Sequence, residues 1–477
     1  MNDHPNAAHA ISPVNRAMIS RLGSAVIVGL AVLLGSGCAS ITPYKERSDY
    51  AVNLLTSGRP AAAAEAFSRD ARRYSGRNEG LLWELEAGKA WQFAADWQNS
   101  RRWFDQAESA LRSFEDEAVI MVRDGLSETT ALVTNQTAIP FRGDGIDPVW
   151  VNVYQALNYL MLGELEGAAV ETRRALIRQE KLADYYAAEL AAAREAGRQA
   201  PRPVDDQAIN RIIRDMEQRT TPVAARYINP FATWLRGTVA QMTGDNENAL
   251  QAIETVIGLT GDPGSLVHQR DVLRQASATG RRAEPQVFIV LESGLGPALR
   301  EVRLDLILPY LGLTAIAFPE PVYYPDPWRG FSVTTSGSHS EGVDVISMDA
   351  MFSAAFRARY GLIVARTLAS YAAKEVGSRA AVINTSGDAQ ILAYILTGIY
   401  KYATTRADTR VWRARGNHFQ VAVIPMPDDG QVEIRLRGRD RIERVSFPPG
   451  KTNNGFIYIQ APSPQLIQTS QQAFDIY

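Results

Sequence analysis

The chain has 477 residues, in which 50 lysines and arginines face 52 aspartates and glutamates, for a formal net charge of −2. This near balance predicts neither nucleic-acid binding nor steering by another polyanion. The length exceeds what one hydrophobic core usually supports, so we expect two or three domains.

The first 37 residues have the three parts of an export signal. Arg16 and Arg21 form a positive flank, residues 22–34 are uncharged and mostly apolar, and Gly35-Ser36-Gly37 precede Cys38. The apolar run is shorter than the roughly 18 residues that a membrane span needs. A plain secretory signal would leave the only cysteine directly after a small-residue cleavage site by coincidence. We therefore predict a signal peptide over residues 1–37 and a lipid on Cys38.

This stretch resembles the lipobox of bacterial lipoproteins, although Leu34 stands one place too early and Gly35 takes the usual leucine position. The resemblance implies a diacylglyceryl group on Cys38 and a further, amide-linked chain, and two or more chains anchor stably where one does not. The second position, directly after the cysteine, is Ala39 and not aspartate. That absence implies outer-membrane sorting in enteric-type bacteria, and we expect the body in the periplasm. Residues 38–48 would be the lipidated tether. No other cysteine remains for a disulfide or a thiolate metal site.

Residues 49–280 are rich in Ala, Leu, Arg and Glu and have helical periodicity. In four places a small residue is followed by another small residue five positions later and by a third residue, usually apolar, four positions after that. The copies are Gly58-Ala63-Phe67, Ala95-Ser100-Phe104, Gly163-Ala168-Thr172 and Gly244-Ala249-Ile253. Gly163 lies 68 residues after Ala95, twice the period of tetratricopeptide repeats.

The pattern suits two antiparallel helices joined by a short turn, with a left-handed residue ending the first helix and small side chains at the crossing. An ordinary helical bundle rich in alanine is the alternative, and the repeat interpretation is favoured. Residues 115–148 fit no repeat, and a charged helical insertion covers about 178–222. Four tryptophans could line a groove, but core positions are favoured: Trp83, Trp91, Trp97 and Trp103.

Composition changes at residues 280–285, so we expect a separate α+β domain over residues 285–477. Its predicted strands are 287–291, 302–308, 313–318, 331–335 and 343–346, and its predicted helices are 348–375 and 389–402. Alternating runs at 419–424, 432–436, 442–447 and 456–459 are separated by Gly, Asp and Pro, which predicts a closing antiparallel meander. The expected fold is therefore α+β and multidomain, with a helical tetratricopeptide-like solenoid followed by this domain.

No recognisable catalytic, metal or cofactor motif emerges. The turn at 293–297 lacks the third glycine of a phosphate-binding loop, and Pro297 removes an amide donor. Residues 336–342 place serines beside His339, but not as a nucleophile elbow. The three histidines after the signal, His268, His339 and His418, lie far apart in sequence. We expect no enzyme, no cofactor and no metal.

One constellation stands out in the C-terminal half. Arg406, Asp408, Arg410 and Trp412 alternate, so in an extended segment they could share one face. Ion pairing and stacking could hold an arginine flat there for a ligand. The alternative is a structural brace between helix and sheet, and it is favoured.

Several features together resemble an uncharacterised family of Gram-negative lipoproteins. They are the lipobox, the helical copies and the motifs at 156–163, 229–237, 317–319 and 406–412. The resemblance covers nearly the whole mature chain, but its motifs have no assigned chemistry. It implies an envelope accessory protein, with the cell-wall synthesis machinery as one expected partner.

Two functions follow as hypotheses. The leading one is a non-enzymatic adaptor, in which the helical repeats grip an envelope protein and the lipid fixes the complex at the membrane. The alternative is a lipoprotein that binds or processes glycan or peptidoglycan through its C-terminal domain. Clustered carboxyl groups beside aromatic side chains in that domain would favour the alternative.

Overall fold

The computed structural model describes residues 44–124, 140–199, 206–261, 264–308, 312–383, 406–450 and 453–475. Cys38, the predicted signal peptide and the predicted helix at 389–402 lie outside these residues. The chain divides into two units, Met1–Arg47 and Ser48–Tyr477, and every described strand lies in the second. Within the described residues, no helix has both the length and the apolar character needed to cross a membrane.

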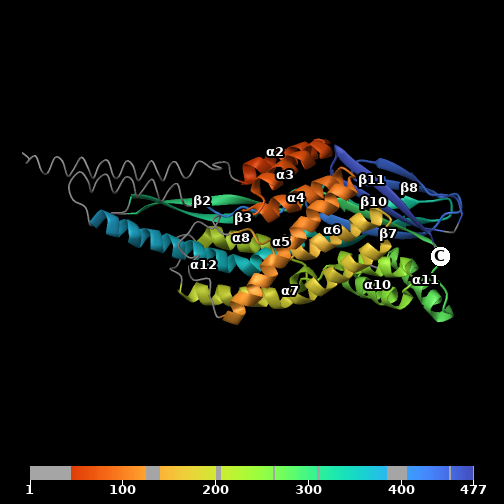
Figure 1. The fold of residues 1–477 in the computed structure, drawn as a ribbon, viewed down its shortest axis with the longest axis horizontal. Coiled ribbons are helices and arrows are strands. Elements are labelled where there is room, and N and C mark those ends of the chain that lie inside the picture. The colour runs from red at the N-terminus through yellow and green to blue at the C-terminus, as the bar shows by residue number, and fades with distance from the viewer. Residues whose placement is uncertain are drawn as a thin grey trace, which may run out of the picture. The chain divides into compact units, whose positions relative to one another are not determined.

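Helices make up the part of this unit that precedes the sheets (Figure 1). They are α2 (Tyr44–Thr56), α3 (Pro60–Tyr74), α4 (Gly80–Phe93), α5 (Trp97–Asp124), α6 (Asp147–Met161), α7 (Leu165–Gln199), α8 (Asp206–Arg219), α9 (Pro230–Met242), α10 (Asn246–Thr260) and α11 (Leu266–Thr279). From α3 onward each packs on the next, except that α7 packs directly on α9. The predicted insertion, namely α8 and the end of α7, packs against the later helix α12 (Met348–Ile383).

The four predicted turn positions are confirmed as left-handed residues. The φ angles of Gly58, Ala95, Gly163 and Gly244 are 79°, 56°, 77° and 88°. Each turn repeats one hydrogen-bond pattern: the Gly163 N–H bonds to the carbonyl three residues back at 3.0 Å, and the next N–H bonds to the carbonyl five residues back at 2.8 Å. This is the Schellman arrangement, which satisfies the free carbonyls at a helix end.

The predicted close crossings are confirmed as well. The second small residues of all four copies are completely buried: Ala63, Ser100, Ala168 and Ala249. A Cβ added at Gly88 would lie 2.9 Å from the Phe104 ring, and one at Gly237 would lie 2.8 Å from the Ala252 Cβ. Larger side chains would therefore push these helix pairs apart. Of the four tryptophans, Trp83 is a core residue and the other three are half-buried.

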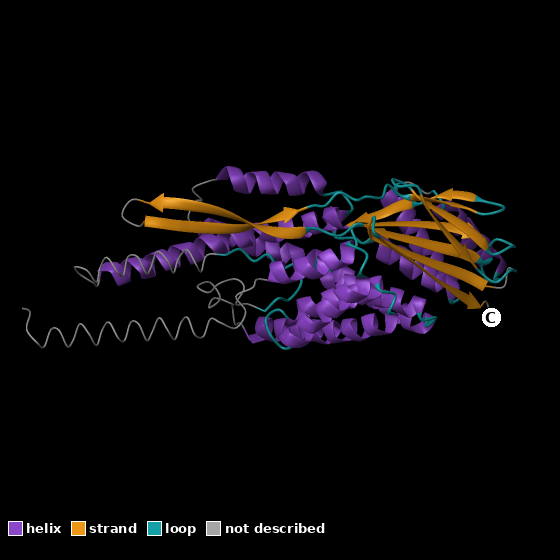
Figure 2. Ribbon diagram, turned by 90° about the horizontal axis from the view of Figure 1, so that it is seen from above, coloured by secondary structure: helices purple, strands orange, loops and turns teal. Residues whose placement is uncertain are grey.

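The strands form two sheets and a separate hairpin, so the α+β class is confirmed. The five-stranded sheet has the order β11 (Leu466–Asp475), β10 (Asn453–Ser463), β1 (Gln286–Ser293), β7 (His418–Pro425) and β6 (Val343–Ser347), antiparallel except for β1 with β10. The four-stranded antiparallel sheet has the order β5 (His339–Glu341), β4 (Phe331–Thr334), β8 (Gln431–Leu436) and β9 (Arg441–Ser446). The hairpin of β2 (Ala298–Leu308) and β3 (Gly312–Val322) lies alongside α12 (Figures 1 and 2).

The two sheets pack face to face, and the helices cover the other side of the five-stranded sheet. Val287, Ile289 and Leu291 of β1 belong to the core between the sheets. Phe419 of β7 points the other way and packs on the Trp150 ring of α6, 4.8 Å between centroids. Every residue of β1 is buried, which explains why it reads as a continuous apolar run rather than an alternating one.

The predicted closing meander is wrong in its strand order. β8 and β9 pair with each other in the second sheet, whereas β7 and β10 flank β1 in the first. β1 is a central strand, so each of its two edges pairs with another strand, β10 on one side and β7 on the other. The turn at 428–430 carries the chain from the first sheet to the second. The pattern also missed β11, and α12 runs beyond the predicted end at residue 375.

The predicted boundary near residues 280–285 falls inside the unit Ser48–Tyr477, between α11 and β1. Several helices contact the five-stranded sheet directly, among them α11 on β7 and α6 on β11. Whether the two halves can fold apart stays a prediction.

Candidate functional site

The segment with the four predicted site residues has no regular secondary structure and lies just before β7. Asp408 and Arg410 meet in a two-pronged ion pair, with Nε 2.9 Å from Oδ1 and one terminal nitrogen 2.7 Å from Oδ2. Arg410 is 8 % exposed and Trp412 is fully buried, whereas Arg406 is exposed. The indole of Trp412 lies edge-on to the rings of Phe104 and Tyr154. The four residues therefore do not form one exposed face, and the contacts are those of a brace.

Two further arginines, not singled out from the sequence, tie this segment to the helices. Arg413 pairs with Asp49 of α2, and Arg415 pairs with Asp147 at the start of α6. Both side chains of the second pair are completely buried. Burial raises the pKa of the Asp147 carboxyl to about 6, although Arg415 opposes the rise.

The backbone of the segment is held too. The Glu86 carboxylate of α4 accepts the N–H groups of Arg413 and Ala414 at 2.6 and 2.9 Å. Glu86 is fully buried. A buried carboxylate needs such donors, since an unpaired one would be very costly. The 406–417 segment thus joins three helices to the strand that follows it.

A second buried pair lies at the centre of the helix–sheet interface. The Lys89 Nζ of α4 is 2.8 Å from the Glu292 Oε2 of β1, and neither side chain is exposed. Tyr458 of β10 also donates to Glu292, and Tyr154 of α6 donates to its other oxygen at 3.1 Å. An added Cβ at Gly416 would overlap the Glu292 side chain, so only glycine fits at that position.

The electrostatics of this centre are those of an enclosed ion pair. Burial lowers the pKa of Lys89 to about 8, against the opposing attraction of Glu292. Burial also raises the pKa of Tyr154 and of Tyr458 well above the ordinary value, and the charge of Glu292 adds to the rise. Both hydroxyl groups therefore stay protonated and act as donors to the carboxylate.

Hydrogen bonds continue from this pair toward the surface of α5. Lys89 donates to Gln92 at 3.1 Å, and Gln92 donates to Asn158 at 2.8 Å. Asn158 donates to Gln155 at 3.0 Å, and Gln155 donates to Asp105 at 2.7 Å. Asp105 is exposed, so an unbroken chain of side chains links the buried charges to solvent.

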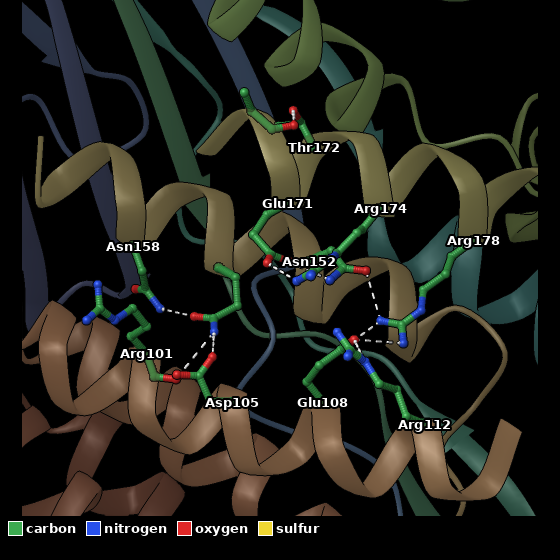
Figure 3. Close-up of polar contacts among 12 residues, drawn as sticks. Arg101, Asp105, Glu108, Arg112, Asn152, Asn158, Glu171, Thr172, Arg174 and Arg178 are labelled. Atoms are coloured by element: carbon green, nitrogen blue, oxygen red, sulfur yellow. Dashed lines mark hydrogen bonds and ion pairs between the residues drawn. The ribbon is translucent and has the colours of Figure 1, made fainter. Parts of the chain in front are cut away.

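Asp105 belongs to a group of polar side chains on α5, α6 and α7, some exposed and some buried, which we call the α5–α7 ridge (Figure 3). Its members are Arg101, Asp105, Glu108, Arg112, Asn152, Glu171, Arg174 and Arg178. Arg178 of α7 bonds to Glu108 of α5 at 2.6 Å and to Asn152 of α6 at 2.9 Å. Glu171 accepts from Asn152 at 2.7 Å and from Arg174 at 2.6 Å. The ridge thus holds two neighbouring networks: Asp105 bonds to Gln155 of α6, and the contacts from Glu108 to Arg174 form a second network across three helices. Arg112 and Arg174 are about half exposed at its edge.

The comparisons with known proteins give no family. No protein-family model, curated protein or solved structure matches the chain. Among the described residues, no group of His, Cys, Asp and Glu side chains is arranged to hold a metal ion.

Proposed function

We propose that the protein is an envelope lipoprotein, held at the outer membrane by lipid on Cys38, that acts as a non-enzymatic scaffold for a protein partner. The observation that supports this most is the series of helical hairpins with one repeated turn. Four hairpins share a left-handed residue at the same turn position and the same pair of hydrogen bonds. We interpret them as degenerate tetratricopeptide-like repeats, an architecture that offers extended surfaces to other proteins.

The buried charges favour a scaffold over a substrate site. Lys89, Glu292, Asp147 and Arg415 are all fully enclosed, so they cannot touch a substrate without a large rearrangement. The two ion pairs, Lys89–Glu292 and Asp147–Arg415, each join two segments that are far apart in sequence. Their effect is to fix the helices on the sheet, which gives a binding surface a defined shape before a partner arrives.

The α5–α7 ridge is the surface we assign to the partner. Beside it on α7, the side chains of Val170 and Ile177 are 45 % and 46 % exposed. Together with Arg174 they occupy positions that share one helix face. Nearby, the Arg101 guanidinium lies 5.3 Å from the centre of the Tyr159 ring. Aromatic and arginine side chains beside exposed aliphatic ones are typical of protein interfaces. The resemblance noted above suggests the cell-wall synthesis machinery as the partner.

Site-specific crosslinking in cells tests this surface. A photoreactive amino acid at Val170 or Ile177 should give a discrete adduct with one envelope protein. The same amino acid at Gln251, an exposed residue of α10, should not give that adduct. Identical adducts at both surfaces, or none from α7, would remove the ridge as the partner site.

A further inference from the structure

The strand β11 forms a long outer edge of the five-stranded sheet. It has ten residues and borders the sheet, where it pairs with β10 (Figure 2). The alternate N–H and C=O groups on the outer side of an edge strand can pair with another chain. Natural proteins usually prevent such pairing with short edge strands, with charged side chains or with a β-bulge. The presence or absence of these features therefore indicates which edges are open to a partner.

The other three edges of the two sheets carry such protection. β5 has only three residues, and β6 contains Asp344 and an irregular register beside it. β9 carries two arginines and a glutamate. In β11, by contrast, residues 466–474 are all uncharged and include no proline, and the register with β10 is regular over residues 468–475. Among the described strands of the two sheets, β11 is thus the unprotected edge.

The hydrogen bonds of β11 indicate which of its backbone groups point outward. The carbonyls of Thr469 and Ala473 accept bonds at 3.4 and 3.3 Å from the side-chain amides of the glutamines that precede them. Each residue of an antiparallel strand directs both of its backbone groups to one side, and successive residues alternate. The odd-numbered residues of β11 therefore direct their groups away from β10. Leu466, which closes the two-residue turn from β10, fits the same alternation.

The side chains of β11 alternate between two faces that the chain itself covers. Ile467 and Ala473 pack on the core between the sheets, and Thr469 donates to Glu443 of β9 at 3.1 Å. On the opposite face, Gln472 lies against the turn between α6 and α7. A partner therefore meets β11 through its edge and not through a face.

The sequence of β11 is self-complementary about Ser470. When two copies pair antiparallel with one Ser470 opposite the other, side chains of the same face meet, as antiparallel pairing requires. Apolar side chains then meet apolar ones, and polar side chains meet polar ones. The opposed residues are Leu466 with Phe474, Ile467 with Ala473, Gln468 with Gln472, and Thr469 with Gln471. A centre one residue earlier or later would place apolar side chains opposite glutamines or Asp475, so the match selects this one register.

We propose that two copies of this chain pair antiparallel through β11, with the two-fold axis at Ser470, and so join their five-stranded sheets into one. The odd-numbered residues of the two strands exchange roughly eight backbone hydrogen bonds. A second copy suits this edge better than an unrelated strand, because each opposed pair is matched and no charge enters the 466–474 span. The pairing uses elements other than the α5–α7 ridge, so it does not depend on the scaffold function.

A single introduced cysteine tests the register in the full-length protein in neutral detergent. Ser470 forms a pair without hydrogen bonds across the axis, where the two Cα atoms lie about 4.5 Å apart, within the roughly 4.4–6.8 Å that a disulfide spans. Ser470→Cys should therefore give a covalent dimer on mild oxidation. The matched control is Gln472→Cys on the same face, whose counterpart in the second copy lies four residues away, at about 13 Å. The control should stay uncrosslinked, as should the unaltered protein, whose own cysteine is Cys38.

A second measurement follows the dimer without a crosslink. Light scattering of the unaltered protein should give the mass of two chains. Gln471→Pro removes one outward N–H from each copy and leaves the bonds to β10 in place, a change that edge strands tolerate. It should weaken the dimer at least about tenfold. The matched control, Gln471→Ala, keeps the N–H and should dimerise like the unaltered protein.

Three results would overturn the proposal. The first is an unaltered protein that is monomeric at tens of micromolar, which is also the result expected if the edge takes a strand of another protein instead. The second is a Ser470→Cys variant that gives no covalent dimer. The third is a Gln471→Pro variant, still folded by circular dichroism, that dimerises as tightly as Gln471→Ala. If the proline variant does not fold, the two cysteine variants still decide.

Discussion

Replacing Glu292 with Gln should be among the most damaging conservative changes in this chain. The substitution keeps the size of the side chain but removes the carboxylate that pairs with Lys89, at 2.8 Å and with no solvent exposure. Removing one partner of a buried pair typically costs about 3–5 kcal/mol. Alternatively, Lys89 can release its proton in the folded variant, so that no unpaired charge is buried. Starting from the ordinary pKa of 10.5, that release costs about 4–5 kcal/mol at pH 7. The expected loss of folding free energy is therefore similar whether Lys89 stays charged or becomes neutral.

The pH dependence identifies the cause. The folded-state pKa of Lys89 is lowered to about 8 from 10.5, so the unfolded chain binds the proton more tightly. Stability from this group therefore rises with pH between about 8 and 10.5 in the unaltered protein. In Glu292→Gln the folded-state pKa falls further, and the rise begins at lower pH. The deficit of the variant should thus shrink as pH increases from 6 to 8, by up to about 1.4 kcal/mol per pH unit.

Urea unfolding of the chain lacking residues 1–38 measures both effects. The control is Glu254→Gln, which removes an exposed ion pair with Arg274 and should cost less than about 1 kcal/mol. Adding Lys89→Met to Glu292→Gln should recover much of the loss, because no unpaired charge remains. A deficit below about 1 kcal/mol with no pH dependence would refute the burial of this pair, and with it the packing of α4 on β1.

Three other outcomes are expected. Cys38→Ala should move the protein from the membrane to the soluble fraction, and a variant that stays membrane-bound would contradict the lipid anchor. Ala168→Leu should destabilise the chain by roughly 1–3 kcal/mol in thermal melts, the usual cost of overpacking a fully buried site. Ala183→Leu, at an exposed position of the same helix, should cost little, and equal effects at the two sites would remove the support for the repeat alignment. After proteolysis near Arg282 the two halves should stay together in gel filtration, because buried ion pairs cross the cut; halves that separate and stay folded would show two independent domains.

Short-range patterns predicted the helical turns well. The left-handed residue, the crossing residue five positions later and the buried residue after it all depend on local geometry, so the spacing alone located them. Ala95 shows how strong this constraint is, because the same turn forms there without glycine, at a φ of 56°. The spacing does not report which hairpin faces the sheet, since that depends on contacts between distant segments.

Long-range pairing is where the sequence was least informative. β1 pairs in parallel with β10, more than 150 residues later, and no local feature encodes that register. β11 was missed because it pairs only with β10 at the sheet edge. Most of its side chains are only half-buried, and its sequence is correspondingly polar. Such a strand resembles a loop when only composition and alternation are considered.

The sequence nonetheless contained a sign that Lys89 and Glu292 of the central ion pair each need a partner. Glu292 directly follows five apolar residues of β1, and Lys89 lies in α4, where 13 residues are buried. A charged residue inside a segment that is buried on all sides needs a partner, since an unpaired charge would be very costly there. The sequence could therefore have indicated that both residues are paired, but not that they pair with each other across 203 positions.

The same pair explains how β1 keeps its register. Buried ion pairs seldom add net stability over apolar residues of similar size, so a role in specificity is the better explanation. If β1 slipped by one residue, Glu292 would turn into the apolar core between the two sheets, and Leu291 would face Lys89. Both charges would then be buried without partners. Because every residue of β1 is buried in the correct register, apolar packing alone discriminates weakly between the two alignments, and the Lys89–Glu292 contact supplies the discrimination.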